Sequence, residues 1–222
     1  MQKPSPAPIL SRVYLLTTEC QTVKTRLLML FAAMMLTTGC ASNKMIDSAQ
    51  QELITPGADK AQIVFMRSSM FGGAIQSSVF DASGGDTKFI GILSTGKRIA
   101  YTVEPGKYRF MVVSEAADFM EAEVLGGKTY YAMVTPRMGA WKARFSMHPV
   151  RNGGPGEFQV QSDKFQGWLK STKLSENTPA SHAWAEENHS NIRGKQADYE
   201  IVWQQKSPAE LAERTLNPDD GV

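Results

Sequence analysis

The chain has 222 residues, of which 42% are hydrophobic and 21% charged, and it contains 18 glycines and 11 prolines. This composition is typical of a globular protein with enough apolar residues for a core. It excludes a multi-pass membrane protein, a collagen-like repeat and a wholly disordered chain. The formal net charge of +2 becomes −1 without the first 39 residues, which carry four basic residues and one acidic residue. A surface so close to neutral offers no electrostatic reason to bind nucleic acid, so we expect no nucleic-acid partner.

The N-terminal part has the order of a secretory signal peptide. Lys24 and Arg26 precede ten consecutive apolar residues, Leu27–Leu36. As a helix this run would rise about 15 Å, which is half of a hydrocarbon core of about 30 Å. A basic start, a short apolar run and a small-residue end indicate a leader that is removed. We therefore expect residues 1–39 to be a signal peptide, and a true start at Val23 would give it a conventional length.

The end of this leader, Leu36-Thr37-Thr38-Gly39-Cys40, resembles the bacterial lipobox, at which signal peptidase II cleaves before a cysteine that carries diacylglycerol. Thr37 stands where leucine is usual, while Gly39 and Cys40 match. The alternative is an ordinary signal peptide followed by an unmodified cysteine. We expect a covalent lipid on Cys40 and no other cofactor.

Lipidation would set the location of the protein. Two or three acyl chains on Cys40 would hold it on a membrane permanently, because a single chain is only marginally retained. Ala41 and Ser42 differ from the aspartate of an inner-membrane retention signal, so the resemblance implies the periplasmic face of the outer membrane. Residues 40–60 are polar and contain Pro56 and Gly57, and we expect an anchor and tether with a short helical stretch around residues 46–53.

Residues 61–150 carry short apolar runs separated by glycine and proline. Such runs, enriched in β-branched and aromatic residues, predict a mainly β protein, an antiparallel β-sandwich of about 7–8 strands. Alternation supports this prediction, since Tyr108, Phe110 and Val112 share one face of a strand. The expected strands are residues 61–67, 77–81, 88–93, 99–103, 108–113, 119–124, 130–135 and 143–148.

Residues 151–222 are expected to form a helical C-terminal extension. Asn152–Gly156 (NGGPG) interrupts the strand pattern, and three- and four-residue spacing of large side chains then predicts one long helix over residues 181–206. Ser207 and Glu210 form a capping-box pattern that predicts a second, short helix from Pro208.

Three motifs resemble those of a group of small bacterial lipoproteins of unknown function with a PEGA-like β-sandwich domain. Ile63–Ser68 (IVFMRS) is similar to the opening strand of that domain, and Val103–Tyr108 (VEPGKY) is similar to a turn between two of its strands. Leu125–Tyr131 (LGGKTYY) is similar to a Gly-Lys-x-Tyr-Tyr step. The resemblance covers about residues 61–135. It implies a fold rather than an activity, and it transfers no catalytic residue.

Gly91–Lys97 (GILSTGK) matches the first seven positions of a phosphate-binding loop. The eighth position should be Ser or Thr to bind magnesium, and here it is Arg98. The motif also needs a helix after the lysine, whereas Ile99–Val103 is typical of a strand. We expect a hairpin turn at this place and no nucleotide site.

His182, Glu186 and His189 would lie on one face of the long helix. The outer two histidines would be about 10 Å apart along its axis, while ligands of one zinc ion lie near 2 Å from the metal. We therefore expect a solvated helix face and no metal site.

Four aromatic residues of the C-terminal part, Trp168, Trp184, Tyr199 and Trp203, have two interpretations. They bury a helix against a sheet, or they form an exposed patch that binds a partner protein or a glycan. The exposure of the rings distinguishes the two.

No catalytic residue is predicted. The chain has no Gly-x-Ser-x-Gly elbow, and Asp219 and Asp220 are neighbours in a terminal tail. We predict a non-catalytic structural or binding module that faces the periplasm, with the membrane as one partner and envelope proteins or glycan as others. One alternative is a small cell-wall or glycan hydrolase, which a Glu/His or Asp/His cluster in a deep pocket would favour. The other is a subunit of an envelope or secretion complex.

Overall fold

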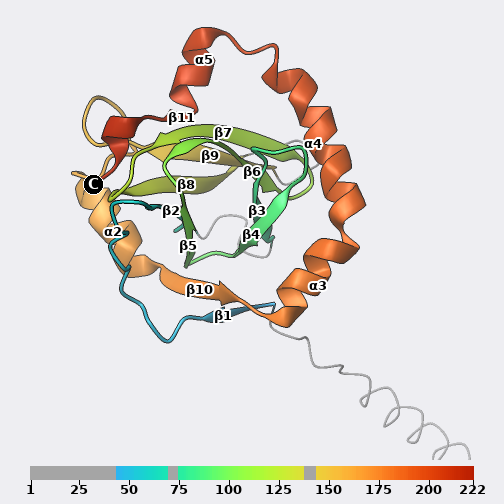
Figure 1. The fold of residues 1–222 in the computed structure, drawn as a ribbon, viewed down its shortest axis with the longest axis horizontal. Coiled ribbons are helices and arrows are strands. Elements are labelled where there is room, and N and C mark those ends of the chain that lie inside the picture. The colour runs from blue at the N-terminus through green and yellow to red at the C-terminus, as the bar shows by residue number, and fades with distance from the viewer. Residues whose placement is uncertain (1–43, 70–74, 138–143) are drawn as a thin grey trace, which may run out of the picture. The chain divides into compact units, whose positions relative to one another are not determined.

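Strand residues outnumber helix residues, 41% to 25%, so the prediction of a mainly β protein is confirmed. The computed structural model describes residues 44–69, 75–137 and 144–222 (Figure 1). The expected signal peptide, its cleavage motif at residues 36–39 and the lipid site Cys40 lie outside the described residues.

The first sheet has six strands, in the order β1-β10-β5-β2-β8-β9. In its centre, β2 runs antiparallel to β5 and parallel to β8. The strands are β1 (Met45–Asp47), β2 (Ala61–Arg67), β5 (Lys97–Val103), β8 (Thr129–Arg137), β9 (Arg144–Val150) and β10 (Lys173–Asn177).

The second sheet has five strands, in the order β11-β7-β6-β3-β4. Four of them are antiparallel neighbours, and β11 is added parallel to β7 at one edge. The strands are β3 (Ser77–Asp81), β4 (Lys88–Leu93), β6 (Gly106–Val113), β7 (Ala117–Val124) and β11 (Thr215–Leu216).

Each strand expected between residues 61 and 150 has a counterpart, from β2 to β9 in chain order. The expectation of a purely antiparallel arrangement is only partly met, because β2–β8, β10–β5 and β11–β7 pair in parallel and both sheets are mixed. A parallel pair joins segments that are far apart in the chain. The local pattern of runs and turns does not encode such a pairing.

The expectation of a hairpin at Gly91–Lys97 is also corrected by the structure. A tight turn is present, with Gly96 at φ +70°, but β4 belongs to the second sheet and β5 to the first. The turn therefore carries the chain from one sheet to the other. No helix follows Lys97, as expected.

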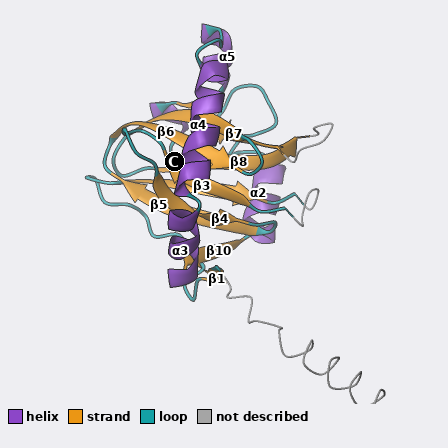
Figure 2. Ribbon diagram, turned by 90° about the vertical axis from the view of Figure 1, so that its right-hand side faces the viewer, coloured by secondary structure: helices purple, strands orange, loops and turns teal. Residues whose placement is uncertain are grey.

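The helices lie on the outer faces of the sheets. In Figure 1, α2 lies on one side of the sheets and α3 and α4 on the other, and Figure 2 shows α3, α4 and α5 following one another along one side. No helix in the described ranges is both long and apolar enough to cross a bilayer. The helices are α2 (Asp163–Ser171), α3 (Pro179–Glu187), α4 (His189–Trp203) and α5 (Pro208–Glu213), with a short 3-10 turn, η1 (Pro218–Asp220).

The single long helix expected over residues 181–206 is two helices that meet at Asn188. The backbone of Asn188 lies at φ −98° and ψ 1°. The side-chain amide of Asn188 donates to the Trp184 carbonyl at 2.8 Å, and the backbone N–H of Asn188 donates to the same oxygen at 3.1 Å. Asparagine breaks the helix because its side chain competes for helical carbonyls. The short helix is confirmed as α5, with the capping box of Ser207 and Glu210 in place.

The two sheets face each other across one apolar core. Phe65 of β2 and Phe110 of β6 meet edge to face, with ring centroids 5.1 Å apart. Phe110 and Val112 are buried and Tyr108 packs against the same core, which confirms the predicted face of that strand. Two smaller apolar clusters join α4 to the outer face of the second sheet and α2 to the outer face of the first.

Residues 44–60 are part of the folded unit instead of a simple tether. β1 pairs with β10, and the Ser48 N–H donates to the Leu174 carbonyl at 2.8 Å. The Gln51 carbonyl accepts from the Arg98 guanidinium at 2.7 Å. The helical stretch expected around residues 46–53 is therefore wrong: residues 45–47 are extended by pairing with an edge strand, and no helix follows up to residue 60.

The C-terminal part, residues 151–222, supplies strands to both sheets as well as helices. β10 joins the first sheet between β1 and β5, and β11 joins the second beside β7. The described residues thus belong to one compact unit, Asn43–Val222, in which segments before and after residues 61–150 complete the sheets.

Gly126 tests this integration, since it lies against the segment expected to be a tether. A Cβ at Gly126 would overlap the carbonyl oxygen of Ala58 and lie 2.9 Å from the carbonyl carbon. We expect Gly126→Ala to lower the free energy of unfolding by about 3 kcal/mol, the cost of overpacking against backbone, as measured by urea denaturation. The control Gly85→Ala meets nothing within 4 Å and should change stability by less than about 0.5 kcal/mol. Equal stability of the two variants would show that residues 57–60 are not packed on the sheet.

Candidate functional site

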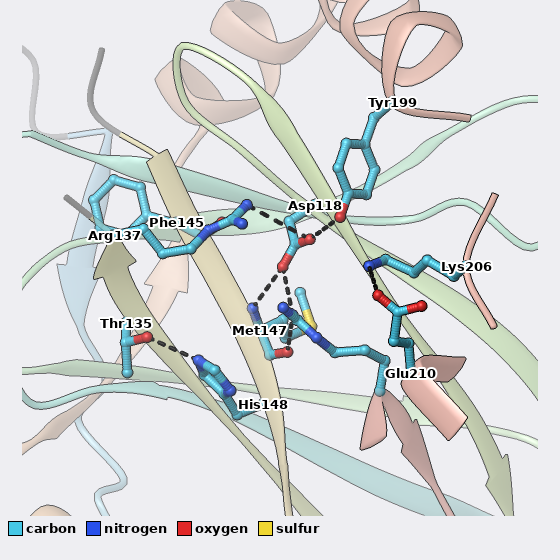
Figure 3. A network of polar contacts seen from close by, with 10 residues as sticks. Asp118, Thr135, Arg137, Phe145, Met147, His148, Tyr199, Lys206 and Glu210 are labelled. Atoms are coloured by element: carbon cyan, nitrogen blue, oxygen red, sulfur yellow. Dashed lines mark hydrogen bonds and ion pairs between the residues drawn. The ribbon is translucent and has the colours of Figure 1, made fainter. Parts of the chain in front are cut away.

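The carboxylate of Asp118, at the start of β7, is a fully buried charge with several partners. Its side chain is 0% exposed. One oxygen, Oδ2, accepts from Arg214 Nη1 at 2.7 Å and from the Met147 N–H at 3.2 Å. The other, Oδ1, accepts from the Tyr199 hydroxyl and lies 3.7 Å from Arg137 Nη2. Figure 3 shows Arg137, Met147 and Tyr199 around this one side chain.

These donors come from four different elements. Arg137 ends β8, Met147 lies in β9, Tyr199 lies in α4, and Arg214 follows α5. Removing a carboxylate from water costs several kcal/mol unless charged and hydrogen-bonding partners replace the water. Asp118 is stable in the interior only with these elements in place, so it ties both sheets and the C-terminal helices together.

Tyr199 connects this network to the helix. Burial, and next the charge of Asp118, raise the pKa of the Tyr199 hydroxyl, so it stays protonated and continues to donate. Its ring packs edge-on against Phe119, with centroids 5.1 Å apart. The residue therefore serves the apolar cluster and the polar network at once.

His148 lies beside the network on β9. Its Nε2 is 2.9 Å from the Thr135 hydroxyl, and its ring stacks on Phe158 with centroids 4.7 Å apart (Figure 3 shows the bond to Thr135). Burial, followed by the positive charge of Arg214, lowers the pKa of His148 to about 4. The imidazole is thus neutral at pH 7.

A groove of about 370 Å³ opens next to Tyr199 and Arg137. Its walls are the C-terminal half of α4, the start of β7 and the paired ends of β8 and β9. Four basic and two acidic side chains line it. The lining residues are Glu115, Ala116, Ala117, Arg137, Arg144, Lys195, Asp198, Tyr199, Val202 and Lys206.

A larger hollow of about 480 Å³ lies over β6 and β7, and we do not favour it as a site. Its one arginine, Arg109, is bound to Glu121 at 2.9 Å and to Glu200 at 3.1 Å. These two carboxylates already neutralise that guanidinium, whereas the groove beside Asp118 has more basic than acidic groups.

The four aromatic residues singled out from the sequence do not form one patch. Trp203 is 4% exposed, and it packs with Tyr199 and Trp184 in the cluster beneath α3 and α4. Trp168 lies on the outer face of the other sheet, with its ring 5.6 Å from that of Phe158. Their rings attach helices to sheets, and only Tyr199 also lines the groove.

The histidines considered as metal ligands are held by other contacts. His182 packs edge-on against Phe89, and His189 Nε2 lies 2.9 Å from Asp86 Oδ1. Across residues 44–69, 75–137 and 144–222, no group of three or more His, Cys, Asp and Glu side chains could hold a metal ion.

Sequence reasoning missed Asp118 and its arginines. A signal was present, because Asp118 has the same strand parity as Met120, Ala122 and Val124, which face the central core. An acid on a core-facing position indicates a buried carboxylate. The identity of its partners was not readable, since they lie 19 to 96 residues further along the chain.

Comparison with protein-family models finds no match for this sequence, and comparison with curated proteins finds none either.

Replacing Asp118 by Asn removes the charge and keeps the shape. Two guanidinium groups would then face a neutral amide, so we expect a loss of about 3–5 kcal/mol in the free energy of unfolding. Asp198→Asn, an exposed carboxylate on α4, is the matched control and should cost less than about 0.5 kcal/mol. A loss below about 1 kcal/mol for Asp118→Asn would contradict the structural role of the network.

His148 predicts a pH dependence. Its pKa is about 4 in the folded protein against 6.5 in an unfolded chain, so the unfolded state binds the proton more readily. The contribution of neutral His148 is complete above pH 6.5 and is lost as the pH falls toward 4, on the order of 2–3 kcal/mol in all. Urea denaturation of the wild type and of His148→Gln at pH 7.5, 5.5 and 4.5 should show a shallower pH dependence for the variant. The exposed His182→Gln should keep the wild-type slope, and identical slopes for all three proteins would disprove the assignment.

Proposed function

We propose that the protein is a lipid-anchored, non-catalytic binding module of the bacterial cell envelope, which faces the periplasm from the outer membrane. In this proposal its two facing sheets are a PEGA-like β-sandwich, and the groove beside Asp118 is the binding surface.

The observation that carries a binding role over a catalytic one is the state of the buried polar groups. Both oxygens of Asp118 accept hydrogen bonds from fixed donors, and His148 is neutral, bonded to Thr135 and stacked on Phe158. A general base needs a lone pair that can reach a substrate proton. These two groups are occupied by the fold, while Arg137, Arg144 and Asp198 of the groove are exposed.

The N-terminal segment supports attachment close to a membrane. Because β1 begins at Met45, the five steps of chain from Cys40 to Met45 can span at most about 18 Å. A lipid on Cys40 would thus hold the folded unit near the bilayer surface, where a module with a fixed orientation can present one end to the periplasm.

The lipid site is tested by Cys40→Ser. We expect wild-type protein to incorporate an alkyne-labelled fatty acid and to sediment with membranes. The variant should lose the label and remain as an uncut precursor or in the soluble fraction, because serine has no thiol to receive diacylglycerol. Unchanged labelling of Cys40→Ser would refute the site, as would a mature wild-type protein that starts at Cys40 with an unmodified thiol.

The binding role is tested with the lipidated protein in detergent, used as bait against a whole-envelope extract with mass spectrometry. Recovery of a defined envelope protein or wall fragment supports the binding module, and a fixed stoichiometric set of proteins would favour the alternative of a complex subunit. Recovery of lipid alone would refute the module. Release of soluble fragments from purified wall by the protein would favour the hydrolase instead.

A further inference from the structure

We propose that the groove beside Asp118 binds a short zwitterionic peptide, one that carries free carboxylates together with an ammonium group. This inference rests on the proposed envelope function for the source of the ligand, and it names the ligand chemistry of the same site.

Two arginines of the groove lie opposite each other on neighbouring strands. Arg137 of β8 and Arg144 of β9 are direct cross-strand partners at the end of the ladder, and both line the groove. Like charges directly opposite each other destabilise a pair of strands. Arg137 has the distant carboxylate of Asp118 at 3.7 Å, while Arg144 makes no ion pair within the described ranges. An anion between the two guanidinium groups would relieve this repulsion.

The geometry of the guanidinium group favours a carboxylate as the anion. A guanidinium presents parallel N–H donors that match the two oxygens of a carboxylate, and two of them side by side can hold one or two carboxylates. Lys195 and Lys206 add positive charge from α4 and the residues after it. Both are held in position, Lys195 by a 2.6 Å bond to the Ser114 carbonyl and Lys206 by Glu210 at 3.9 Å with only 17% of its side chain exposed.

The groove also carries two acidic side chains. Glu115 and Asp198 are on the same lining as the four cations. They would repel a doubly charged phosphate, but they are suitable partners for an ammonium group. A ligand with carboxylates and an amine satisfies both sets, whereas a simple anion satisfies one.

The position of the groove in the fold also favours such a ligand. In Figures 1 and 2, β1 lies at the bottom of the folded unit, while α5 and the C-terminal end of α4 lie toward the top. The C-terminal half of α4 contributes Tyr199 to the groove, and Lys206 follows this helix. Under the proposed attachment at Cys40, the groove is therefore at the end away from the first strand and faces the periplasm. Peptides of the cell wall, with free carboxylates and free amino groups, have this chemistry there.

The test is titration calorimetry of the purified full-length protein in detergent. The probe is a soluble wall fragment, a disaccharide carrying a peptide with free carboxylates and one amine. We expect binding that weakens as salt rises, and no binding of the same fragment with its carboxylates amidated. Equal binding of the amidated fragment, or stronger binding of inorganic phosphate, would overturn the proposal.

Variants separate the groove from net charge. Arg144→Glu should weaken binding at least about tenfold, since a charge-assisted pair is lost and a repulsion is added. Arg144→Gln, which adds no repulsion, should weaken it less, and Lys170→Glu, the same charge change on exposed α2, should leave it unchanged. Melting curves confirm that the compared proteins are folded, and Lys195→Gln replaces Arg144→Glu if the latter is not. Equal loss in Lys170→Glu, or no loss in the groove variants, refutes the site.

The two proposals fail in different ways. An envelope partner whose capture is insensitive to Arg144 leaves the binding module intact and refutes the groove. If the native wild-type protein carries no lipid but binds the fragment, the absence of lipid refutes the anchor and the binding supports the groove.

Discussion

The structure depends on one buried carboxylate. Asp118 accepts from the backbone of β9 and from side chains of α4 and the residue after α5, and it lies near the arginine that ends β8. The cost of burying the charge is offset only when all these elements are docked, so folding of the two sheets and of the C-terminal helices is coupled. The apolar cluster beneath α4 supplies the buried apolar area that holds this helix on the second sheet. The bond from Tyr199 to Asp118 fixes the position of the helix there.

Two segments outside residues 61–150 have the same coupling role in the first sheet. β10 joins β5 in parallel and then offers its other edge to β1, so a segment near residue 45 and one near residue 175 complete the sheet together. Arg98 reinforces this junction by donating to carbonyls of Gln51, Leu169 and Thr172. The segment that follows residue 44 is thus fixed to the first sheet by backbone and side-chain bonds.

The groove and the buried network of Asp118 share Arg137, which lines the groove and lies 3.7 Å from the carboxylate. Asp118 compensates Arg214 directly and Arg137 at longer range, and it lies too far inside to serve Arg144. The surplus positive charge is therefore left on the side that faces solvent. Tyr199 lines this groove and also donates to Asp118, so one side chain belongs to both the groove and the buried network.

The sequence by itself determined what depends on neighbours along the chain. The alternation at Tyr108, Phe110 and Val112 predicted a buried strand face, the Ser207 and Glu210 pattern predicted a capped helix, and the runs between residues 61 and 150 predicted the strands. Only the tertiary structure decided what depends on distant segments. These features are the parallel pairing of β2 with β8, the strand at Met45–Asp47 and the partners of Asp118. The reason is physical: turns, caps and periodicity act over about four residues, whereas the position of a charge in a core is set by whichever remote donors the fold brings to it.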